Sequence, residues 1–351
     1  MEAEIQLKLC DLIVVGAGPA GVAAAIKSAE AGYSTIIVEK SEGRRKPCGG
    51  VLTTACIDVL SRELNLSLPE NVLSSPSSLS LFYVSPSGYG GRVRNYSLVN
   101  VERRAFDEWL RSEAYERGAK LLYGASLVDI EQRGREVIVN VKHRGRVEKL
   151  AARFLVGSDG ALSKVRRALY PETSFKLASV VQEHWDGNGE IEDCFYMLLL
   201  GSDVTPLYGY LIPKGSTLII GAGAPTLREA RASLARVKDA LKEMDFKPYR
   251  LVRKEHWFIP QGTVLYGDGN IVLAGDAGGF CNPFSGEGIR FALETGAAAA
   301  QALKNEDGFS ESYKGEVEEI ASLIKVLSQF MVRLDDEARD EFVKRELRRF
   351  F

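Results

Sequence analysis

Apolar residues near the start of the chain occur in two short runs separated by a small-residue stretch. The runs LIVV at residues 12–15 and TIIV at 35–38 are rich in β-branched residues and predict two buried strands. Between them, GAGPAG at 16–21 predicts a tight turn and the alanine-rich stretch 22–30 predicts a helix. This order of strand, glycine turn, helix and strand predicts a β–α–β unit and an α/β fold.

The middle of the chain follows a different pattern. In residues 75–100 and 178–222, apolar and polar positions alternate between turn residues. A period of two predicts antiparallel strands, which we expect to form one sheet that roofs a pocket. Its apolar side chains suit a large apolar substrate, although they could instead pack the core of this part of the chain. They are Phe82, Tyr83, Phe195, Tyr196, Met197, Leu198, Tyr208 and Tyr210.

Beyond residue 308 the chain is charged and helical in pattern. Apolar residues recur at steps of three and four, which predicts an amphipathic helix that packs on the body of the protein. They are Val317, Ile320, Ile324, Leu327, Met331 and Leu334. An interfacial position near lipid is the alternative, and the ending RELRRFF at 345–351 would favour it.

Composition narrows the class of protein. The chain has 351 residues, 45% of them apolar and 26% charged, with a formal net charge of −2, so we expect a globular protein that does not bind nucleic acid. No apolar run reaches the length of a membrane span, and we expect no signal peptide. Five cysteines without a CxxC pair and three scattered histidines argue against disulfides and a metal site. We therefore expect a reducing, cytoplasmic location.

The glycine turn carries the first chemical signal. Gly16 permits the tight turn, Gly18 lets the backbone approach a pyrophosphate, and Gly21 allows close packing of helix on strand. Glu39 ends the second predicted strand, where its carboxylate could accept hydrogen bonds from a ribose. A purely structural turn is the alternative, and the pattern does not separate FAD from NAD. Residues 216–244 repeat a strand, GxG and helix but lack the third glycine, so we expect only a strand-to-helix turn there.

Three further stretches resemble the para-hydroxybenzoate hydroxylase-like flavoproteins. Residues 271–300 resemble the second flavin fingerprint of that family, with Asp276 placed to bond the ribityl chain. Residues 154–169 resemble its "DG" motif, and residues 101–110 resemble its "R..FD..L" helix start, whose arginine is Arg103 here. The resemblance implies FAD as cofactor and an FAD-binding Rossmann-like (βαβ) domain of this type.

The same resemblance implies a division of the chain and a set of cofactor contacts. The FAD-binding domain would comprise residues 1–74, 101–175 and 262–305, the substrate-binding antiparallel sheet residues 75–100 and 176–261, and the helical region residues 306–351. The residues expected to contact FAD are Gly16, Gly18, Pro19, Ala20, Gly21, Glu39, Lys40, Cys48, Gly49, Arg103, Asp159, Gly160, Gly275, Asp276, Gly286, Gly288 and Ile289.

The sequence KPCGG at 46–50 follows the second strand of the β–α–β unit. Together with P-x-Y-x-Y-x-I-P at 206–213, it resembles the geranylgeranyl reductase family over roughly residues 10–300. The second motif of that family is Y-x-W-x-F-P, so Tyr210 stands for the Trp and Ile212 for the Phe. Residues expected to contact substrate are Tyr208, Tyr210, Pro213, Phe195, Met197 and Pro283.

This second resemblance implies an enzyme that saturates isolated carbon–carbon double bonds of an isoprenoid chain with reduced FAD. The substrate would be a geranylgeranyl lipid or geranylgeranyl diphosphate. The electron donor would be NAD(P)H or a ferredoxin-like protein, and peripheral contact with a membrane would follow from the substrate. A flavin-dependent monooxygenase or halogenase on the same fold, and a flavoprotein that only relays electrons, are the alternatives.

The implied catalytic residues lie in two loops: Cys48, Gly49 and Gly50 in the first and Cys281 in the second. We expect Cys48 to face the cavity, as half of a redox pair with Cys281 or on the route of the proton. Cys281 could instead be a small buried apolar side chain. The basic cluster Arg44, Arg45 and Lys46 could hold a substrate phosphate, the phosphates of FAD, or nothing but solvent.

Overall fold

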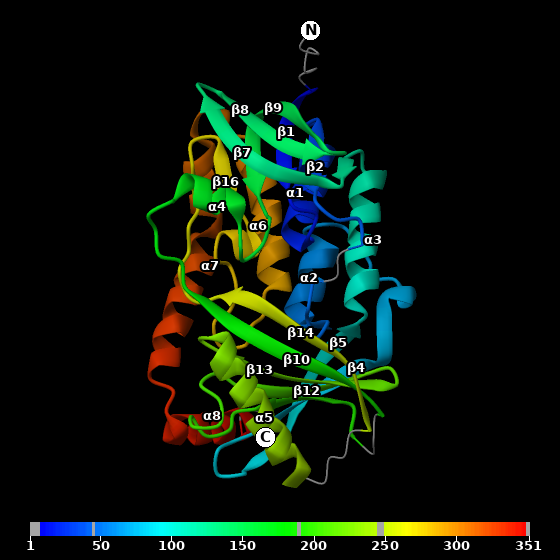
Figure 1. Ribbon diagram of the computed structural model, residues 1–351, viewed down its shortest axis with the longest axis vertical. Helices are drawn as coiled ribbons and strands as arrows, with labels where there is room; N and C mark the ends of the chain where they lie inside the picture. The colour runs from blue at the N-terminus through cyan, green and yellow to red at the C-terminus, as the bar shows by residue number, and fades with distance from the viewer. Residues whose placement is uncertain (1–7, 44–45, 188–190, 244–248, 349–351) are drawn as a thin grey trace.

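Two sheets of eight strands each form the framework of the computed structural model, which describes residues 8–43, 46–187, 191–243 and 249–348. Figure 1 shows the first sheet near the N-terminal end of the molecule and the second near the opposite end, with helices α2, α6 and α7 running between them. A cavity that lies between the two sheets therefore receives residues from both.

The first sheet has the order β15-β16-β9-β1-β2-β6. Its strands are β1 (Lys8–Val15), β2 (Thr35–Glu39), β6 (Lys120–Tyr123), β9 (Arg146–Gly157), β15 (Gly267–Asp268) and β16 (Ile271–Leu273), and β7 (Ala125–Arg133) and β8 (Glu136–His143) extend it from β9. Val15 pairs in parallel with Val38 and Gly157, and Gly157 pairs with Leu273. Four strands thus end together at one edge, and ligands of open α/β sheets bind outside such an edge.

Helices cover this sheet by close contact of small residues. Helix α1 (Pro19–Glu30) packs on α6 (Ile289–Ala302), and a Cβ at Gly296 would overlap the carbonyl oxygen of Ala20. Alanines of both helices lie in the same core, and their short side chains allow the two helix axes to lie close together. The other helices here are α2 (Thr54–Arg62), α3 (Arg103–Glu116), α4 (Lys164–Leu169), η1 (Glu70–Val72) and η2 (Gly275–Ala277).

The second sheet has the order β14-β10-β13-β12-β11-β4-β5-β3. Its strands are β3 (Val51–Leu52), β4 (Leu73–Val84), β5 (Gly90–Val101), β10 (Leu177–Asp186), β11 (Cys194–Leu198), β12 (Gly209–Lys214), β13 (Thr217–Ala224) and β14 (Arg250–Pro260). The expected strands are present, but β4 and β11 pair in parallel, so the expectation of a wholly antiparallel sheet is wrong. No hairpin joins these two strands, and alternation of side chains does not encode the direction of pairing.

Helix α5 (Leu227–Glu243) packs on one face of the second sheet through Leu234 and Val237. It follows β13 directly, which confirms the strand-to-helix interpretation of residues 216–244. The opposite face of the sheet is turned toward the first sheet, so side chains alternate between α5 and the interior of the molecule.

The helices α7 (Phe309–Val332) and α8 (Asp336–Arg348) follow η3 (Glu306–Gly308) and complete the described chain. Val317 and Ile324 are buried and Ile320 packs against the same core, which confirms that the amphipathic stripe packs on the body. The last residues of RELRRFF, 349–351, lie outside the described part. No helix of the described residues has the length and apolarity needed to cross a membrane.

Candidate active site

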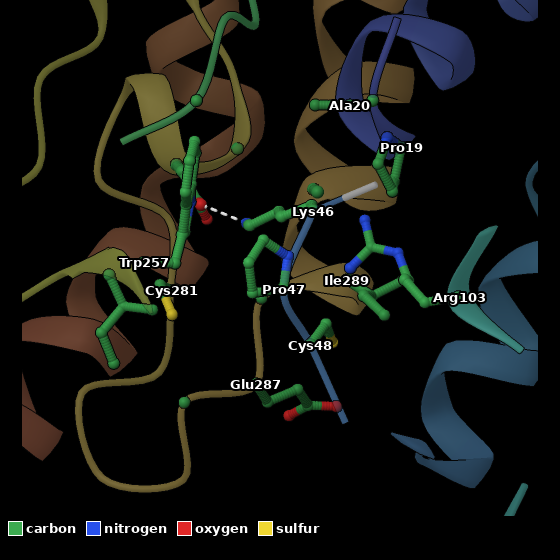
Figure 2. A pocket seen from close by; sticks show the side chains of 18 of the residues that line it. Pro19, Ala20, Lys46, Pro47, Cys48, Arg103, Trp257, Cys281, Glu287 and Ile289 are labelled. Carbon is green, nitrogen blue, oxygen red and sulfur yellow. Dashed lines mark hydrogen bonds and ion pairs between the residues drawn. The ribbon is translucent and has the colours of Figure 1, made fainter. Parts of the chain in front are cut away.

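A cavity of about 840 Å³ lies between the carboxyl edge of the first sheet and the inner face of the second. Its walls come from the glycine turn, the loop 46–50, the loop that leads into α6, and β4, β10, β11, β12 and β14. Figure 2 shows Lys46, Pro47 and Cys48 crossing this cavity between Arg103 and Cys281. The volume lies toward the upper end of the range for small-molecule sites, so there is room for a large ligand.

The glycine turn has the geometry that the sequence predicts. Gly16 has φ +107°, and a Cβ there would lie 2.5 Å from the carbonyl oxygen of Ser158. A Cβ at Gly21 would overlap the carbonyl oxygen of Gly16, so Gly21 serves helix packing and does not line the cavity. Gly18, Pro19 and Ala20 line it at the N-terminus of α1, where backbone amides favour an anion.

Glu39 stands beside this turn and stabilises it. Its carboxylate accepts hydrogen bonds from the amides of Ala17, at 2.8 Å, and Ser41, at 3.0 Å. Glu39 and Lys40 both line the cavity. Arg111, which the sequence reasoning missed, also lines it and donates to the carbonyl of Ala17. Its only signal was its place two helical turns beyond Arg103 in α3.

The "DG" stretch brings a buried carboxylate to the cavity. Asp159 Oδ2 accepts from the amide of Lys164 at 2.6 Å, whereas Oδ1 is buried without a hydrogen-bond partner among the described residues. Burial raises the pKa of this carboxyl group. Asp159 and Gly160 both line the cavity, so a ligand hydroxyl there could satisfy Oδ1.

The second glycine-rich loop follows β16 and places Asp276 at the same edge of the first sheet. Gly275, Asp276, Gly286, Gly288 and Ile289 all line the cavity. Asp276 Oδ2 forms an ion pair with Lys46 Nζ at 2.5 Å, drawn as the dashed line in Figure 2. Lys46 is therefore not simply a solvated side chain, while Arg44 and Arg45 lie outside the described residues.

The two cavity cysteines have opposite electrostatic surroundings. Burial alone would raise the pKa of Cys48, but Arg103, Lys46 and a 3.4 Å hydrogen bond from the Gly50 amide together lower it. Burial, reinforced by Asp276, raises the pKa of Cys281 well above that of an ordinary thiol. Both cysteines are free and line the same cavity. Cys48 is thus the thiol more easily ionised.

A buried lysine, which the sequence reasoning also missed, ties the cysteine loop to the second sheet. Lys214 ends β12 and donates to the carbonyls of Val101, at 2.9 Å, and Gly50, at 3.4 Å, and to Asn100 Oδ1. Gly50 has φ +66°, and a Cβ there would overlap the carbonyl oxygen of Val101. Lys214 directly follows the Y-x-Y-x-I-P stretch, and this position was the only signal in the sequence.

Four of the six residues expected to contact substrate line the cavity. Tyr208, Tyr210, Phe195 and Met197 line the cavity, but Pro213 and Pro283 do not. Pro213 alternates with Ile212 in β12, so it belongs to the other face. The aromatic and apolar residues Phe82, Tyr196 and Leu198 likewise pack on the α5 side. The core-packing alternative is therefore correct for these three, whereas Tyr83 both packs in the core, against Phe342, and lines the cavity.

Comparison with known proteins assigns the family. A family model described as the FAD binding domain matches residues 9–306. Geranylgeranyl diphosphate reductase of Rhodobacter capsulatus is 31% identical in an alignment 360 positions long, which covers 95% of this chain and 87% of the relative. The chain belongs to the geranylgeranyl reductase family of FAD-binding proteins. Protein CbrA of Escherichia coli K12 is 29% identical over 320 residues, covering 86% of this chain and 87% of the relative.

Solved structures confirm the fold. A geranylgeranyl bacteriochlorophyll reductase-like protein from Thermoplasma acidophilum has a TM-score of 0.85 at 20% identity and covers 97% of this chain and 92% of its own. The myxobacterial chondrochloren halogenase has a TM-score of 0.75 at 16% identity, covering 98% and 90%. At such identities the likeness shows the fold and not the reaction. The predicted α/β fold of the para-hydroxybenzoate hydroxylase type is confirmed.

The protein is an FAD-dependent oxidoreductase, and the cavity residues fit that cofactor. A Cβ at Gly18, the N-cap of helix α1, would meet no atom within 4 Å, so there is open space beside the N-terminus of this helix. Beside the glycine turn, Oδ1 of Asp159, which has no hydrogen-bond partner among the described residues, is an acceptor suited to a hydroxyl or amine donor. These features match a dinucleotide, which carries phosphates and hydroxyl groups together.

Proposed function

We propose that this oxidoreductase saturates isolated carbon–carbon double bonds in the prenyl chain of a geranylgeranyl lipid or of geranylgeranyl diphosphate. The observation that carries the proposal is a single cavity in which an apolar sheet face stands opposite the cofactor-binding edge. The likeness to geranylgeranyl diphosphate reductase over nearly the whole chain supports the choice of substrate.

The inner face of the second sheet suits a hydrocarbon. Leu81, Leu98, Val180, Met197 and Ile259 line the cavity there. Burying one methylene group contributes about 0.8 kcal/mol, so one five-carbon prenyl unit contributes about 4 kcal/mol. An apolar wall also binds successive units equally well, which lets a long chain move along it from one double bond to the next.

The cofactor would be held by the residues that converge on the carboxyl edge of the first sheet. The turn at Gly16 and Gly18 would receive the pyrophosphate, Glu39 a ribose, and Asp276 the ribityl chain. When bound, FAD supplies the hydride. Lys46 is already paired with Asp276, and it would therefore hold that carboxylate in position at the wall of the cavity.

Saturation of one double bond also needs one proton, because an unpolarised alkene accepts no hydride alone. Cys48 Sγ is placed to hold this proton, since it lies in the cavity and its pKa is lowered by Arg103 and Lys46. A thiol with a lowered pKa is a better acid than an ordinary thiol. After transfer, solvent returns a proton to the thiolate, and the apolar walls keep water from the second carbon.

The electrons would come from NAD(P)H or from a ferredoxin-like protein. Strand β13 belongs to the second sheet and α5 packs on that sheet, so this pair is not a second nucleotide-binding unit and a nicotinamide would have to bind by another route. A prenyl lipid resides in a membrane, so we also propose peripheral contact with its surface.

The test is anaerobic incubation of the reduced holoenzyme with geranylgeranyl substrates, followed by mass analysis. Products heavier by about two mass units per saturated bond support the proposal, since each turnover adds one hydride and one proton. Products that contain added oxygen or halogen after aerobic incubation with NADPH would support the monooxygenase or halogenase instead. Electron transfer to an acceptor without any change in the lipid would support the relay.

Matched serine variants separate the role of Cys48 from general effects. Cys48→Ser should retain FAD and lose most alkene reduction. Cys10→Ser makes the same change at another half-buried free cysteine that does not line the cavity, and it should retain activity. Normal turnover by Cys48→Ser would show that this loop is structural.

A further inference from the structure

A row of polar side chains crosses the otherwise apolar inner face of the second sheet. Tyr210 in β12 pairs with Gly221 in β13, Gly221 pairs with Gln182 in β10, and Gln182 pairs with Glu255 in β14. The four residues are therefore in register across four neighbouring strands. Tyr210 and Gln182 both line the cavity.

Gly221 allows this row to form. A Cβ at Gly221 would overlap the ring and hydroxyl of Tyr210, so the tyrosine lies flat across β13. Its hydroxyl thereby reaches Gln182 Oε1 at 2.9 Å. Tyr210 stands where the geranylgeranyl reductase motif has Trp, and a Trp ring has no hydroxyl with which to continue such a row.

The chemistry of Glu255 fixes the direction of every hydrogen bond in the row. Its carboxylate accepts hydrogen bonds from Gln182 Nε2 at 2.6 Å and His184 Nε2 at 2.8 Å, and its Oε1 forms an ion pair with Arg253, whose Nε lies 3.0 Å away. An ionised carboxylate only accepts, so the amide nitrogen of Gln182 must face it and the amide oxygen must face Tyr210. The Tyr210 hydroxyl must therefore donate to Gln182.

In this arrangement the Tyr210 hydroxyl donates its proton to Gln182, so its oxygen can only accept a further hydrogen bond. Burial raises the pKa of Tyr210 well above its ordinary value, so the hydroxyl stays neutral. Among the described residues, none donates a hydrogen bond to this oxygen. The hydroxyl of the neighbouring Tyr208 also donates within the protein, to the carbonyl oxygen of Ser285 at 2.5 Å.

We propose that the Tyr210 oxygen recognises a hydroxyl group on the substrate. This inference rests on the proposed function and narrows it: the prenyl substrate carries a free hydroxyl, as a prenyl alcohol or glycerol lipid does, at the part that meets β12. A diphosphate does not match this position, because its oxygens are acceptors and would face another acceptor. Tyr210 is thus a specificity-determining residue.

The test compares geranylgeraniol with its methyl ether, which has the same chain but no hydroxyl proton. Binding to the holoenzyme is followed by the change in flavin absorbance, so turnover is not needed. Wild type should bind the alcohol about three- to tenfold more tightly, the range expected for one neutral hydrogen bond. Tyr210→Phe should bind both probes equally, while Tyr96→Phe, which alters another wall of the cavity, should keep the preference.

Glu255→Gln provides a readout that a purely structural role would not produce. A glutamine at 255 can donate as well as accept, so Gln182 can turn its amide nitrogen toward Tyr210. The Tyr210 hydroxyl can then accept from Gln182 and donate its proton to the ligand. The preference for the alcohol should then shrink, and binding of the methyl ether should rise above that of wild type. Equal binding of both probes to wild type, or an unchanged preference in Tyr210→Phe, would overturn this inference alone. Failure of both probes to bind would overturn the proposed function with it.

Discussion

Replacing Lys214 with Met should loosen the cysteine loop without changing the shape of the sheet. Methionine has nearly the length of lysine but leaves the acceptors Val101 O and Asn100 Oδ1 without the ammonium. The carbonyl of Gly50 keeps its bond from the Val101 amide at 2.8 Å. Each buried acceptor that loses its partner costs roughly 1–3 kcal/mol. Relief of the buried charge offsets part of this, so we expect a loss of about 2–4 kcal/mol in the free energy of unfolding.

The measurement is urea unfolding of the two holoenzymes, together with the rate at which iodoacetamide alkylates Cys48 across pH. Gly50 would keep its bond from the Val101 amide but lose the one from Lys214, so its amide should be held less firmly against the Cys48 sulfur and the apparent pKa of Cys48 should rise. Lys238→Met is the matched control, since Lys238 pairs with Glu183 on the other side of the sheet and is partly exposed. It should cost under about 1 kcal/mol and leave Cys48 unchanged. Equal losses in the two variants would refute the role assigned to Lys214.

Two further predictions concern the cavity. Asp276→Ala should purify with much less FAD than wild type, because it removes a cofactor ligand and leaves Lys46 unpaired, whereas the exposed Asp268→Ala should remain yellow; equal flavin absorbance per chain would contradict this. Cys48 should be alkylated at lower pH than Cys281, since its pKa is lowered and that of Cys281 is raised. With a lowered folded-state pKa, the stability due to Cys48 is fully present above its unfolded pKa and is lost as the pH falls through the folded one. The difference in free energy of unfolding between wild type and Cys48→Ser should therefore shrink on acidification, and a difference that grows instead would reverse the assignment.

The glycine turn and its surroundings could be predicted from the sequence because the contacts there join residues that are close in the chain. Gly16, Gly21 and Glu39 lie within one β–α–β unit, where spacing alone determines which backbone atoms meet. The alternation of side chains along β12 also separates Ile212, which lines the cavity, from Pro213, which does not.

The contacts that the sequence did not reveal join segments distant in the chain. Lys214 meets Gly50 across 164 residues, and the parallel pairing of β4 with β11 joins two strands between which β6 to β9 of the first sheet lie in the chain. Arg111 is an ordinary helix residue until the fold brings it to Ala17. Such contacts depend on tertiary packing, and neither periodicity nor motif spacing encodes them.

The most direct test of the central claim is a single anaerobic turnover. Holoenzyme with its FAD fully reduced is mixed with a geranylgeranyl substrate, flavin reoxidation is followed by absorbance, and the lipid is then weighed by mass spectrometry. We predict one saturated bond, with a gain of about two mass units, for each flavin reoxidised. Flavin that stays reduced in the presence of bound lipid, or that reoxidises while the lipid mass is unchanged, would contradict it.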